Sequence, residues 1–322
     1  MHIPDGFLDS KTAIVTGVLA ATGLSFALRQ ARVHLPPRRV PLLGLAAAFV
    51  FAAQMINFPV AGGTSGHLIG GVLAAVLLGP GPAVIVLSAV LIVQCLMFAD
   101  GGLSALGANI LNMGVLGVVG GWVVYFAVSR VVKGLFGCIL GAAFAAWCST
   151  VLAAIACAGE LAVSRTVGWS VVLPAMAGVH LFIGVGEGLI TALVLVAIAR
   201  ARPELLQPEP PVPSRRSYAA VVVYGGLLAL ALALFASPFA SAWPDGLDRV
   251  VEVLGFGGKA TDPLVPAPLP DYEMPGIQWR VVSTSVAGGV GTIVVFALAW
   301  LLARVLVPKG DQIEATRSGR SP

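Results

Sequence analysis

The stretch PAVIVLSAVLIVQCLMF, residues 82–98, decides the fold class, because it contains no Asp, Glu, Lys or Arg. An α-helix rises about 1.5 Å per residue, so crossing the hydrocarbon core of a bilayer takes about 20 predominantly apolar residues. The whole chain of 322 residues has the same character, being 58% hydrophobic and 11% charged. Soluble domains carry about 25% charged residues. The sequence therefore predicts an integral membrane protein.

Further apolar runs set the number of predicted spans. They lie near residues 12–28, 41–56, 67–79, 82–98, 108–128, 134–158 and 169–199, with two more near 217–236 and 281–306. The run at 67–79 is short, but TSGH before it and GPGP after it favour a short or tilted span over a surface loop. We predict an all-α polytopic membrane protein, in which a seven-helix bundle is followed by two further transmembrane helices that flank an extracytoplasmic segment.

The basic residues favour one orientation, because cytoplasmic loops collect Lys and Arg. With the N-terminus outside, the cytoplasmic side holds Arg29, Arg32, Arg38, Arg39, Arg130, Lys133, Arg200 and Arg202, whereas Lys11 and Arg165 fall outside. We expect a multi-pass protein of the cell (inner or plasma) membrane with an extracytoplasmic N-terminus and a cytoplasmic C-terminus. The net charge of +4 would then meet membrane lipid headgroups, and we expect no nucleic-acid partner.

Proline and charge divide the chain into units. Residues 1–202 are predicted to form the first membrane domain, followed by a cytoplasmic linker at 203–216, PELLQPEPPVPSRR. Residues 217–308 would form a second domain whose two spans enclose an external polar segment at about 237–280. Residues 309–322 would form a cytoplasmic tail.

The chain begins with MHIPDGF, which places a histidine directly after the initiator methionine. The Met1 amine, the His2 backbone nitrogen and His2 Nδ1 can close a five-membered and a six-membered chelate ring on one metal ion. Three nitrogens in one plane with one corner open suit Ni(II), Cu(II) or low-spin Co(II). His67, in NFPVAGGTSGH on the same external side, is the candidate for the fourth nitrogen. An incidental surface role for His2 and a helix-capping role for His67 are the alternatives.

Four other polar residues are candidates for supporting roles. His180 and Glu187 lie seven residues apart within the run 169–199, where ionisable side chains are costly and are functional or paired. Asn109 and Asn112, in ALGANILNMG, would lie near the external end of another span. Each of the four could support the site or form hydrogen bonds between helices, and His180 and Glu187 could alternatively assist ion passage.

Four motifs, MHIPDGFL, SGHLIGG, ALGANILNMG and HLFIGVGEGLIT, follow in this order within residues 1 to about 200. Together they resemble the CbiM/NikM family, the cobalt and nickel substrate-binding (S) components of energy-coupling-factor ABC transporters. The segment SPFASAWPDGLDRV resembles the PDGLE/NikN-like accessory domain of these systems, here fused at the C-terminus, with Asp248 where the pattern has glutamate. The resemblance implies a metal held by Met1, His2 and His67, and no cofactor besides the transported Ni(II) or Co(II).

The resemblance also implies partner proteins. The sequence has no GxxxxGK[ST] phosphate-binding loop, so ATP would be hydrolysed elsewhere. The family pairs its binding component with an energy-coupling transmembrane (T) component and two cytoplasmic ABC ATPases. On the first span a stripe of small residues recurs every four positions, which could accept a partner helix or pack within the bundle. This stripe consists of Ala13, Gly17, Ala21 and Ser25.

Two other functions stay open on the sequence alone. A metal-dependent intramembrane enzyme would need an open coordination position and a base such as Glu187, Asp5 or Asp9. A sensor would bind metal without moving it. The sequence has no HExxH motif, and His67 would fill the fourth corner, so we expect a transporter subunit and not an enzyme. The four-nitrogen set does not distinguish nickel from cobalt.

Overall fold

The computed structural model describes residues 1–206 and 215–306. Within these ranges the chain is almost entirely helical, with one antiparallel pair of short strands, β1 (Phe58–Val60) and β2 (Thr64–Gly66). Seven helical segments there are long and apolar enough to cross a membrane: Ser10–His34, Pro80–Phe98, Leu106–Val131, Gly134–Val163, Trp169–Ala201, Ala219–Phe239 and Arg280–Leu306. The predicted all-α polytopic membrane protein is confirmed. That the last two segments cross the bilayer around an extracytoplasmic segment stays a prediction.

Two of the predicted spans are shorter than a membrane-crossing helix. α2 (Val40–Gln54) has 15 residues, and the run at 67–79 forms α3 (Gly71–Leu78) with 8 residues. Gly70 and Gly79, on either side of α3, have φ angles of 76° and 92°, which glycine adopts without a Cβ penalty. Non-helical backbone at membrane depth must be covered by protein, and Leu68 next to it is 1% exposed. The first domain thus contains the seven predicted helical segments, five of them long, while α2 and α3 are short, as predicted for the run at 67–79.

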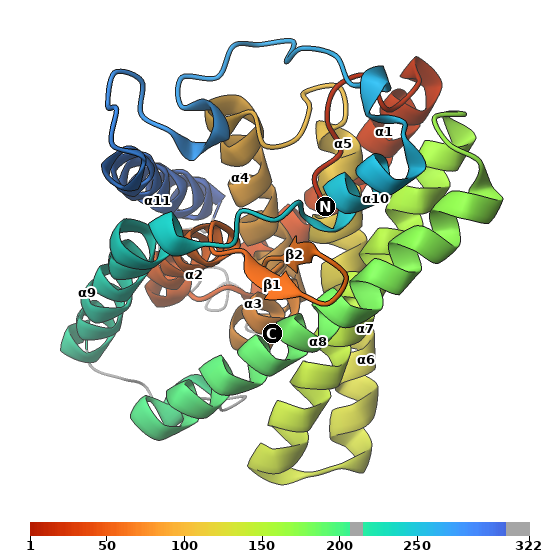
Figure 1. The fold of residues 1–322 in the computed structure, drawn as a ribbon. Coiled ribbons are helices and arrows are strands. Elements are labelled where there is room, and N and C mark those ends of the chain that lie inside the picture. Colours follow the sequence, from red (N-terminus) through yellow and green to blue (C-terminus); the bar gives the residue numbers. More distant parts are fainter. Residues whose placement is uncertain (207–214, 307–322) are drawn as a thin grey trace.

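α4 (Pro80–Phe98) is the centre of the first domain. Its side chains are buried on nearly all sides, as expected for a helix that is apolar all round. It packs against α1 (Ser10–His34), α2 and α3. A neighbouring layer contains α6 (Gly117–Val131), α7 (Gly134–Val163) and α8 (Trp169–Ala201), with α7 packed between the other two (Figure 1). α6 continues from α5 (Leu106–Asn109) through a π-helical stretch, Ile110–Leu116.

The second domain packs mainly on α2 and also contacts α4. α9 (Arg215–Ala231), which ends in a π-helical turn at Leu232–Ala236, and α11 (Arg280–Leu306) both contact α2. Glycines allow this close packing, since a Cβ on Gly291 would lie 2.3 Å from Phe51 Cζ and one on Gly225 would lie 2.7 Å from Leu45. The two domains therefore share one apolar core around α2.

Residues 237–279, which we call the external segment after its predicted location, connect α9 to α11 across the end of the first domain where the chain begins. α10 (Gly246–Leu254) lies beside the N-terminus (Figure 1). Several backbone hydrogen bonds attach this segment to the first domain: Ser241 N to Asn57 O (2.8 Å), Ser65 N to Pro244 O (2.8 Å), Thr261 N to Asp5 O (3.0 Å) and Leu269 N to Met97 O (2.9 Å). The fold thus brings the second domain against the predicted metal site.

Short 3₁₀ turns complete the described chain, at Pro37–Arg39, Pro203–Leu206, Ser237–Phe239, Gly257–Lys259 and Pro270–Tyr272. Within the predicted linker 203–216, residues 207–214 lie outside the described residues. The predicted tail 309–322 lies outside them entirely.

Candidate metal centre

The first residues of the chain fold back into the protein. Met1, Ile3 and Phe7 are at most 5% exposed. Asn109, at the end of α5, brackets Ile3: the Ile3 N–H donates to Asn109 Oδ1 (2.9 Å), and Asn109 Nδ2 donates to the Ile3 carbonyl (3.1 Å). These contacts fix the backbone one residue after His2. Asn109 thus contacts the N-terminal segment directly, and its support of a metal site stays a prediction.

The turn Pro4–Asp5–Gly6 is held from both sides. The Asp5 carboxylate accepts hydrogen bonds from Ser104 N (2.8 Å), Ser104 Oγ (2.6 Å), Leu103 N (3.2 Å) and Leu264 N (3.2 Å). Burial raises the pKa of Asp5, but the hydrogen bonds outweigh it and hold that pKa below its usual value. Gly6 has φ +89°, and a Cβ there would lie 2.5 Å from the Lys259 carbonyl. The turn thus needs glycine, and it packs directly against the external segment.

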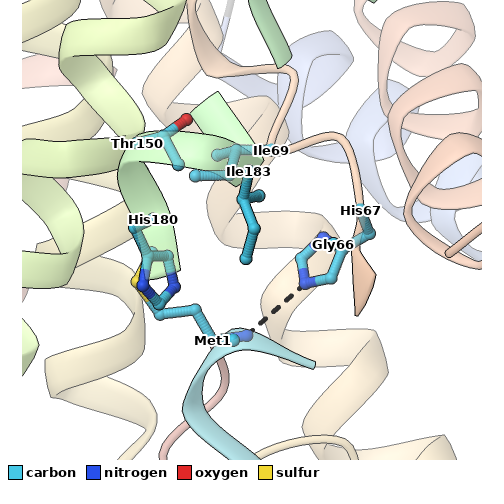
Figure 2. Close-up of a pocket in the computed structure, with 8 residues that line it drawn as sticks. Met1, Gly66, His67, Ile69, Thr150, His180 and Ile183 are labelled. Carbon is cyan, nitrogen blue, oxygen red and sulfur yellow. Dashed lines mark hydrogen bonds between the residues drawn. The ribbon is translucent and has the colours of Figure 1, made fainter. Parts of the chain in front are cut away.

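Met1, His2 and His67 meet at one point. Met1 N lies 3.5 Å from His67 Nε2 (Figure 2), and the rings of His2 and His67 stack with centroids 5.4 Å apart. Metal–nitrogen bonds of about 2.0 Å at right angles place neighbouring ligands about 2.8 Å apart, so the amine and Nε2 are within about 0.7 Å of that spacing. His67 Nδ1 faces the Leu68 carbonyl (3.2 Å), which favours a lone pair on Nε2, toward the amine. The structure therefore brings the three predicted ligand residues together.

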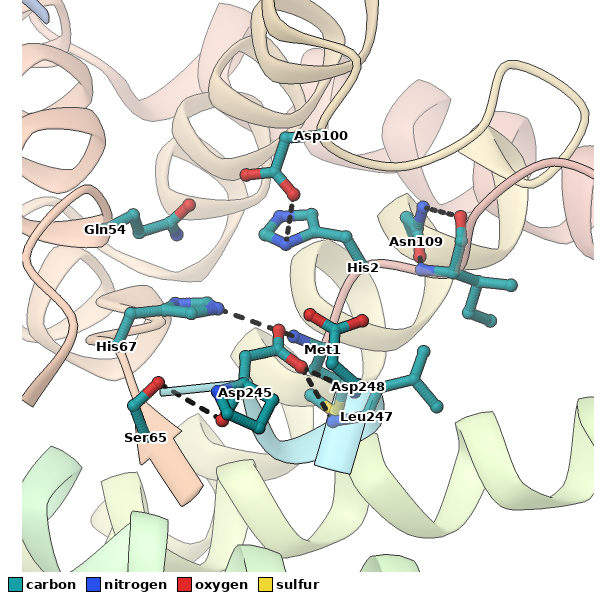
Figure 3. Close-up of polar contacts among 12 residues, drawn as sticks. Met1, His2, Gln54, Ser65, His67, Asp100, Asn109, Asp245, Leu247 and Asp248 are labelled. Atoms are coloured by element: carbon teal, nitrogen blue, oxygen red, sulfur yellow. Dashed lines mark hydrogen bonds and ion pairs between the residues drawn. The ribbon is translucent and has the colours of Figure 1, made fainter. Parts of the chain in front are cut away.

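Asp245 of the second domain joins this group. Its Oδ2 forms an ion pair with the Met1 amine. Ligand atoms of His2, His67 and Asp245 all lie within 4.8 Å of one another (Figure 3). Asp245 was not among the ligand candidates predicted from the sequence, which placed none in the second domain. The sequence feature that could have indicated Asp245 is the motif WPDGLD. Asp245 also caps α10, because its Oδ1 accepts hydrogen bonds from Leu247 N (2.8 Å) and Asp248 N (3.0 Å).

The His2 ring has a polar partner at each nitrogen. Nε2 lies 3.2 Å from Gln94 Oε1, and Nδ1 lies 3.1 Å from Asp100 Oδ1. Gln94 is oriented by its own contact, since its Nε2 donates to Gln54 Oε1 (2.9 Å), and Gln54 Nε2 donates to the Ile69 carbonyl (2.9 Å). Both partners are acceptors, so Asp100 and Gln94 compete for the single proton of a neutral ring; the Gln94 carbonyl can hold that proton on Nε2 once a metal takes Nδ1. A metal at Nδ1 would replace the contact with Asp100.

Burial and charge give these groups different proton affinities. Burial lowers the pKa of His67 to about 4 and also lowers that of His2, so both imidazoles are neutral at pH 7. Burial also acts to lower the pKa of the Met1 amine, but the Asp245 carboxylate outweighs it, and that pKa lies above its usual value. Asp245 is itself destabilised by burial, yet the amine holds its pKa well below the usual range. The amine therefore carries the proton that a metal must displace.

Comparison with known proteins identifies the family. A family model described as the cobalt uptake substrate-specific transmembrane region (CbiM) matches residues 2–205. This chain belongs to the CbiM family. A model of the PDGLE domain matches residues 219–308, which confirms the predicted fused domain.

Relatives of this CbiM-family chain are named as transport proteins and not as enzymes. It is 37% identical over 309 residues to a putative fused nickel transport protein NikMN of Archaeoglobus fulgidus, covering 94% of this chain and 98% of the relative. It is 32% identical to the cobalt transport protein CbiM of Geobacter sulfurreducens, covering 82% and 81% of the two chains. A crystal structure of a truncated transition metal transporter superposes with a TM-score of 0.57 at 33% identity, covering 62% of this chain and 99% of that one.

Asp248, the residue at which the CbiM-family chain departs from the PDGLE pattern, lies in the first turn of α10. Its side chain is exposed, and the neighbouring Asp245 raises its pKa to about 6. It does not belong to the group formed by His2, His67 and Asp245. The acid that reaches the candidate metal centre is thus the first acid of the motif and not the last.

Glu187 supports the loop that carries His67. This side chain of α8 is 1% exposed, and its two carboxylate oxygens accept hydrogen bonds from Ile69 N (2.6 Å) and Gly70 N (2.9 Å). The pair of N–H groups sits where the chain changes from the β2 strand to α3. Glu187 is therefore connected to His67 through this loop, and its support of a metal site stays a prediction.

The other predicted supporting residues have different surroundings. His180 lines the same small cavity as Met1 and His67 (Figure 2), but its Nδ1 faces the Met176 carbonyl at 2.8 Å. Its ring packs against Gly246 of the second domain, where a Cβ would lie 2.7 Å from His180 Nε2. Asn112 donates to Glu160 (2.6 Å), a contact between the π-helical stretch and α7. His180 thus packs against the second domain, whereas Asn112 connects the π-helical stretch to α7.

The small residues of the α1 stripe differ in burial. A Cβ on Gly107 of α5 would lie 2.5 Å from the Gly17 Cα atom, so Gly17 accepts a close neighbour within the bundle. Ala13 is half-buried, whereas Ala21 and Ser25 are exposed. A partner helix at the exposed end of the stripe stays a prediction.

Proposed function

We propose that this protein is the substrate-binding membrane component of an ATP-driven importer for Ni(II) or Co(II). The observation that carries the proposal is the meeting of the Met1 amine, His2 and His67 in a covered position. The printed names of its relatives, which are nickel and cobalt transport proteins, support the same class of cargo.

Four nitrogens hold the cargo in this proposal. The Met1 amine, the His2 backbone nitrogen and His2 Nδ1 form two adjoining chelate rings, and His67 Nε2 takes the remaining corner. The 3.5 Å separation of Met1 N and His67 Nε2 supports this arrangement, because a small contraction around an ion brings the two into neighbouring corners. The His2 amide and the amine each release a proton when the ion binds, as nitrogen ligands must.

The metal centre faces the extracytoplasmic side. The candidate ligands gather where α1 begins, whereas Arg29 and Arg32 lie near the other end of that helix. Arg200 likewise lies in the last turn of α8, and Arg130 lies in that of α6. This separation agrees with the tendency of Lys and Arg to remain on the cytoplasmic side.

Transport requires partners. A transmembrane coupling component and two cytoplasmic ATPases supply ATP hydrolysis, because the chain itself has no phosphate-binding loop. The exposed part of the α1 stripe, Ala21 and Ser25, is the surface that we assign to the coupling component. Co-purification with those partners, tested with Ala21→Leu, checks this part of the proposal: wild-type yield of the complex from the variant would contradict it.

Metal titration of two matched variants tests the site. His67→Ala removes a ligand, and His180→Ala removes a second buried histidine that lines the same cavity. Calorimetric titration with Ni(II) and Co(II) should show high-affinity binding lost in His67→Ala, whereas His180→Ala, which loses only the packing against Gly246, should weaken binding less. Equal affinities in His67→Ala and the wild type would refute the assignment.

An N-terminal extension tests the amine separately. Two residues placed before Met1 turn its amine into an amide, and the covered position of Met1, 5% exposed, leaves little room for them. Binding should be lost with this extension and kept when the same residues follow Pro322. Tight binding by the N-terminally extended protein that still requires His2 would show that the amine is not a ligand.

A further inference from the structure

We propose that Asp245, in the fused second domain, supplies an oxygen ligand to the metal that the N-terminal nitrogens hold. The inference rests on the function proposed above and adds a fifth donor, from a different domain, to the same centre. The second domain would then take part in metal binding itself.

The two carboxylate oxygens of Asp245 contact different groups. Oδ1 accepts the N–H groups of Leu247 and Asp248, at 2.8 and 3.0 Å, and so caps α10. Oδ2 points the other way and contacts the Met1 amine. Because the cap fixes the carboxylate plane, Oδ2 is held toward the predicted metal position without the loss of rotamer freedom that a surface aspartate would incur.

The backbone around Asp245 is attached to the strand that leads to His67. Ser65, two residues before His67, donates its N–H to the Pro244 carbonyl (2.8 Å) and its Oγ–H to the Trp243 carbonyl (2.7 Å). On the other side, Gly246 packs on the His180 ring so closely that a Cβ would clash. The carboxylate is therefore positioned from both flanks, as second-sphere contacts position ligands in metal proteins.

Charge also favours an anionic donor at this position. A divalent ion bound by a neutral amine, one deprotonated amide and two neutral imidazoles leaves one net positive charge in a covered site. A buried charge is costly unless it is paired. The Asp245 side chain, 16% exposed, pairs with the Met1 ammonium and is placed to pair with a metal held at the same point. Carboxylate oxygen combined with imidazole nitrogen is an established donor set for divalent transition metals.

A different role for Asp245 makes the opposite prediction. If the carboxylate serves only as the partner of the Met1 ammonium, its removal frees the amine, and metal binds more tightly. If it is a ligand, its removal weakens binding. The sign of the change in affinity therefore separates the two roles.

Asp245→Asn is the informative variant, because asparagine keeps the helix cap through its carbonyl oxygen and replaces the Oδ2 position with a non-coordinating NH₂ group. Asp248→Asn removes the same charge from the same helical turn without touching the cluster. In Ni(II) and Co(II) titrations of the full chain, Asp245→Asn should weaken binding at least tenfold, and Asp248→Asn should change it less than threefold. Tighter or unchanged binding in Asp245→Asn overturns the inference.

Asp245→Cys provides a gain of signal that does not depend on affinity. A thiolate at a ligand position puts a sulfur atom on the metal, which X-ray absorption and a sulfur-to-metal charge-transfer band detect. The Co(II)-loaded variant should show both signals, and Asp248→Cys should show neither. Metal-loaded Asp245→Cys without a sulfur neighbour would overturn the inference even if Asp245→Asn failed to fold. A wild-type protein that binds neither ion would instead refute the proposed function.

Discussion

Glu187→Gln is the change that most directly tests how the His67 loop is held. Glu187 offers two acceptor oxygens to two backbone donors, Ile69 N at 2.6 Å and Gly70 N at 2.9 Å, in a position that is 1% exposed. Glutamine has nearly the same shape but keeps one acceptor, and its NH₂ group then faces the second N–H. One buried donor is left without a partner.

The expected loss of metal affinity follows from this one unpaired N–H group. A buried donor without an acceptor costs about 1–3 kcal/mol. If this cost falls on the ordered loop, metal affinity drops about 5- to 150-fold, since about 1.4 kcal/mol corresponds to a factor of ten. Calorimetric titration measures the affinity, and hydrogen exchange at the Ile69 and Gly70 amides reports whether the loop opens more often.

Glu160→Gln is the matched control. Glu160 is also a buried carboxylate, 9% exposed, but it accepts from Asn112 Nδ2 and not from the loop backbone. Glutamine retains the one acceptor that this contact needs. We expect metal affinity close to that of the wild type. Affinity and amide exchange in Glu187→Gln within twofold of the wild type, or an equal loss in both variants, would refute the reasoning.

Two further predictions concern the candidate metal centre and the packing of the second domain against it. Metal affinity should rise by about two decades per pH unit between pH 6 and 8, because the amine, whose pKa is raised, and the His2 amide each lose one proton. His67, whose pKa is about 4, adds no proton step in that range, and a titration series with a slope of zero would contradict the prediction. Gly246→Ala should displace α10 from the His180 ring and lower metal affinity. Gly258→Ala is the control, because a Cβ there meets no atom within 4 Å, and it should leave metal affinity unchanged. Equal affinity in the two variants would contradict the packing argument.

The sequence by itself was sufficient for the class of fold and for naming three candidate ligand residues that the structure brings together. Apolar runs predict membrane helices because hydropathy and helix length are local properties. The proposed chelate of Met1 and His2 is likewise local, since two neighbouring residues supply three nitrogens. His67 was predicted from its place on the external side, and the structure brings it within 3.5 Å of the amine.

Tertiary structure decided the remaining features. The shortening of α3 depends on Gly70 and Gly79, whose positive φ values are stable because the surrounding helices cover the non-helical backbone. Asp245 lies 244 positions from Met1 in the sequence, and Gln94 lies 92 positions from His2. Sequence periodicity reports neighbours three or four residues apart on one helix. It carries no information on which residue a distant domain brings to an amine, because that contact forms only when the external segment packs across the end of the bundle.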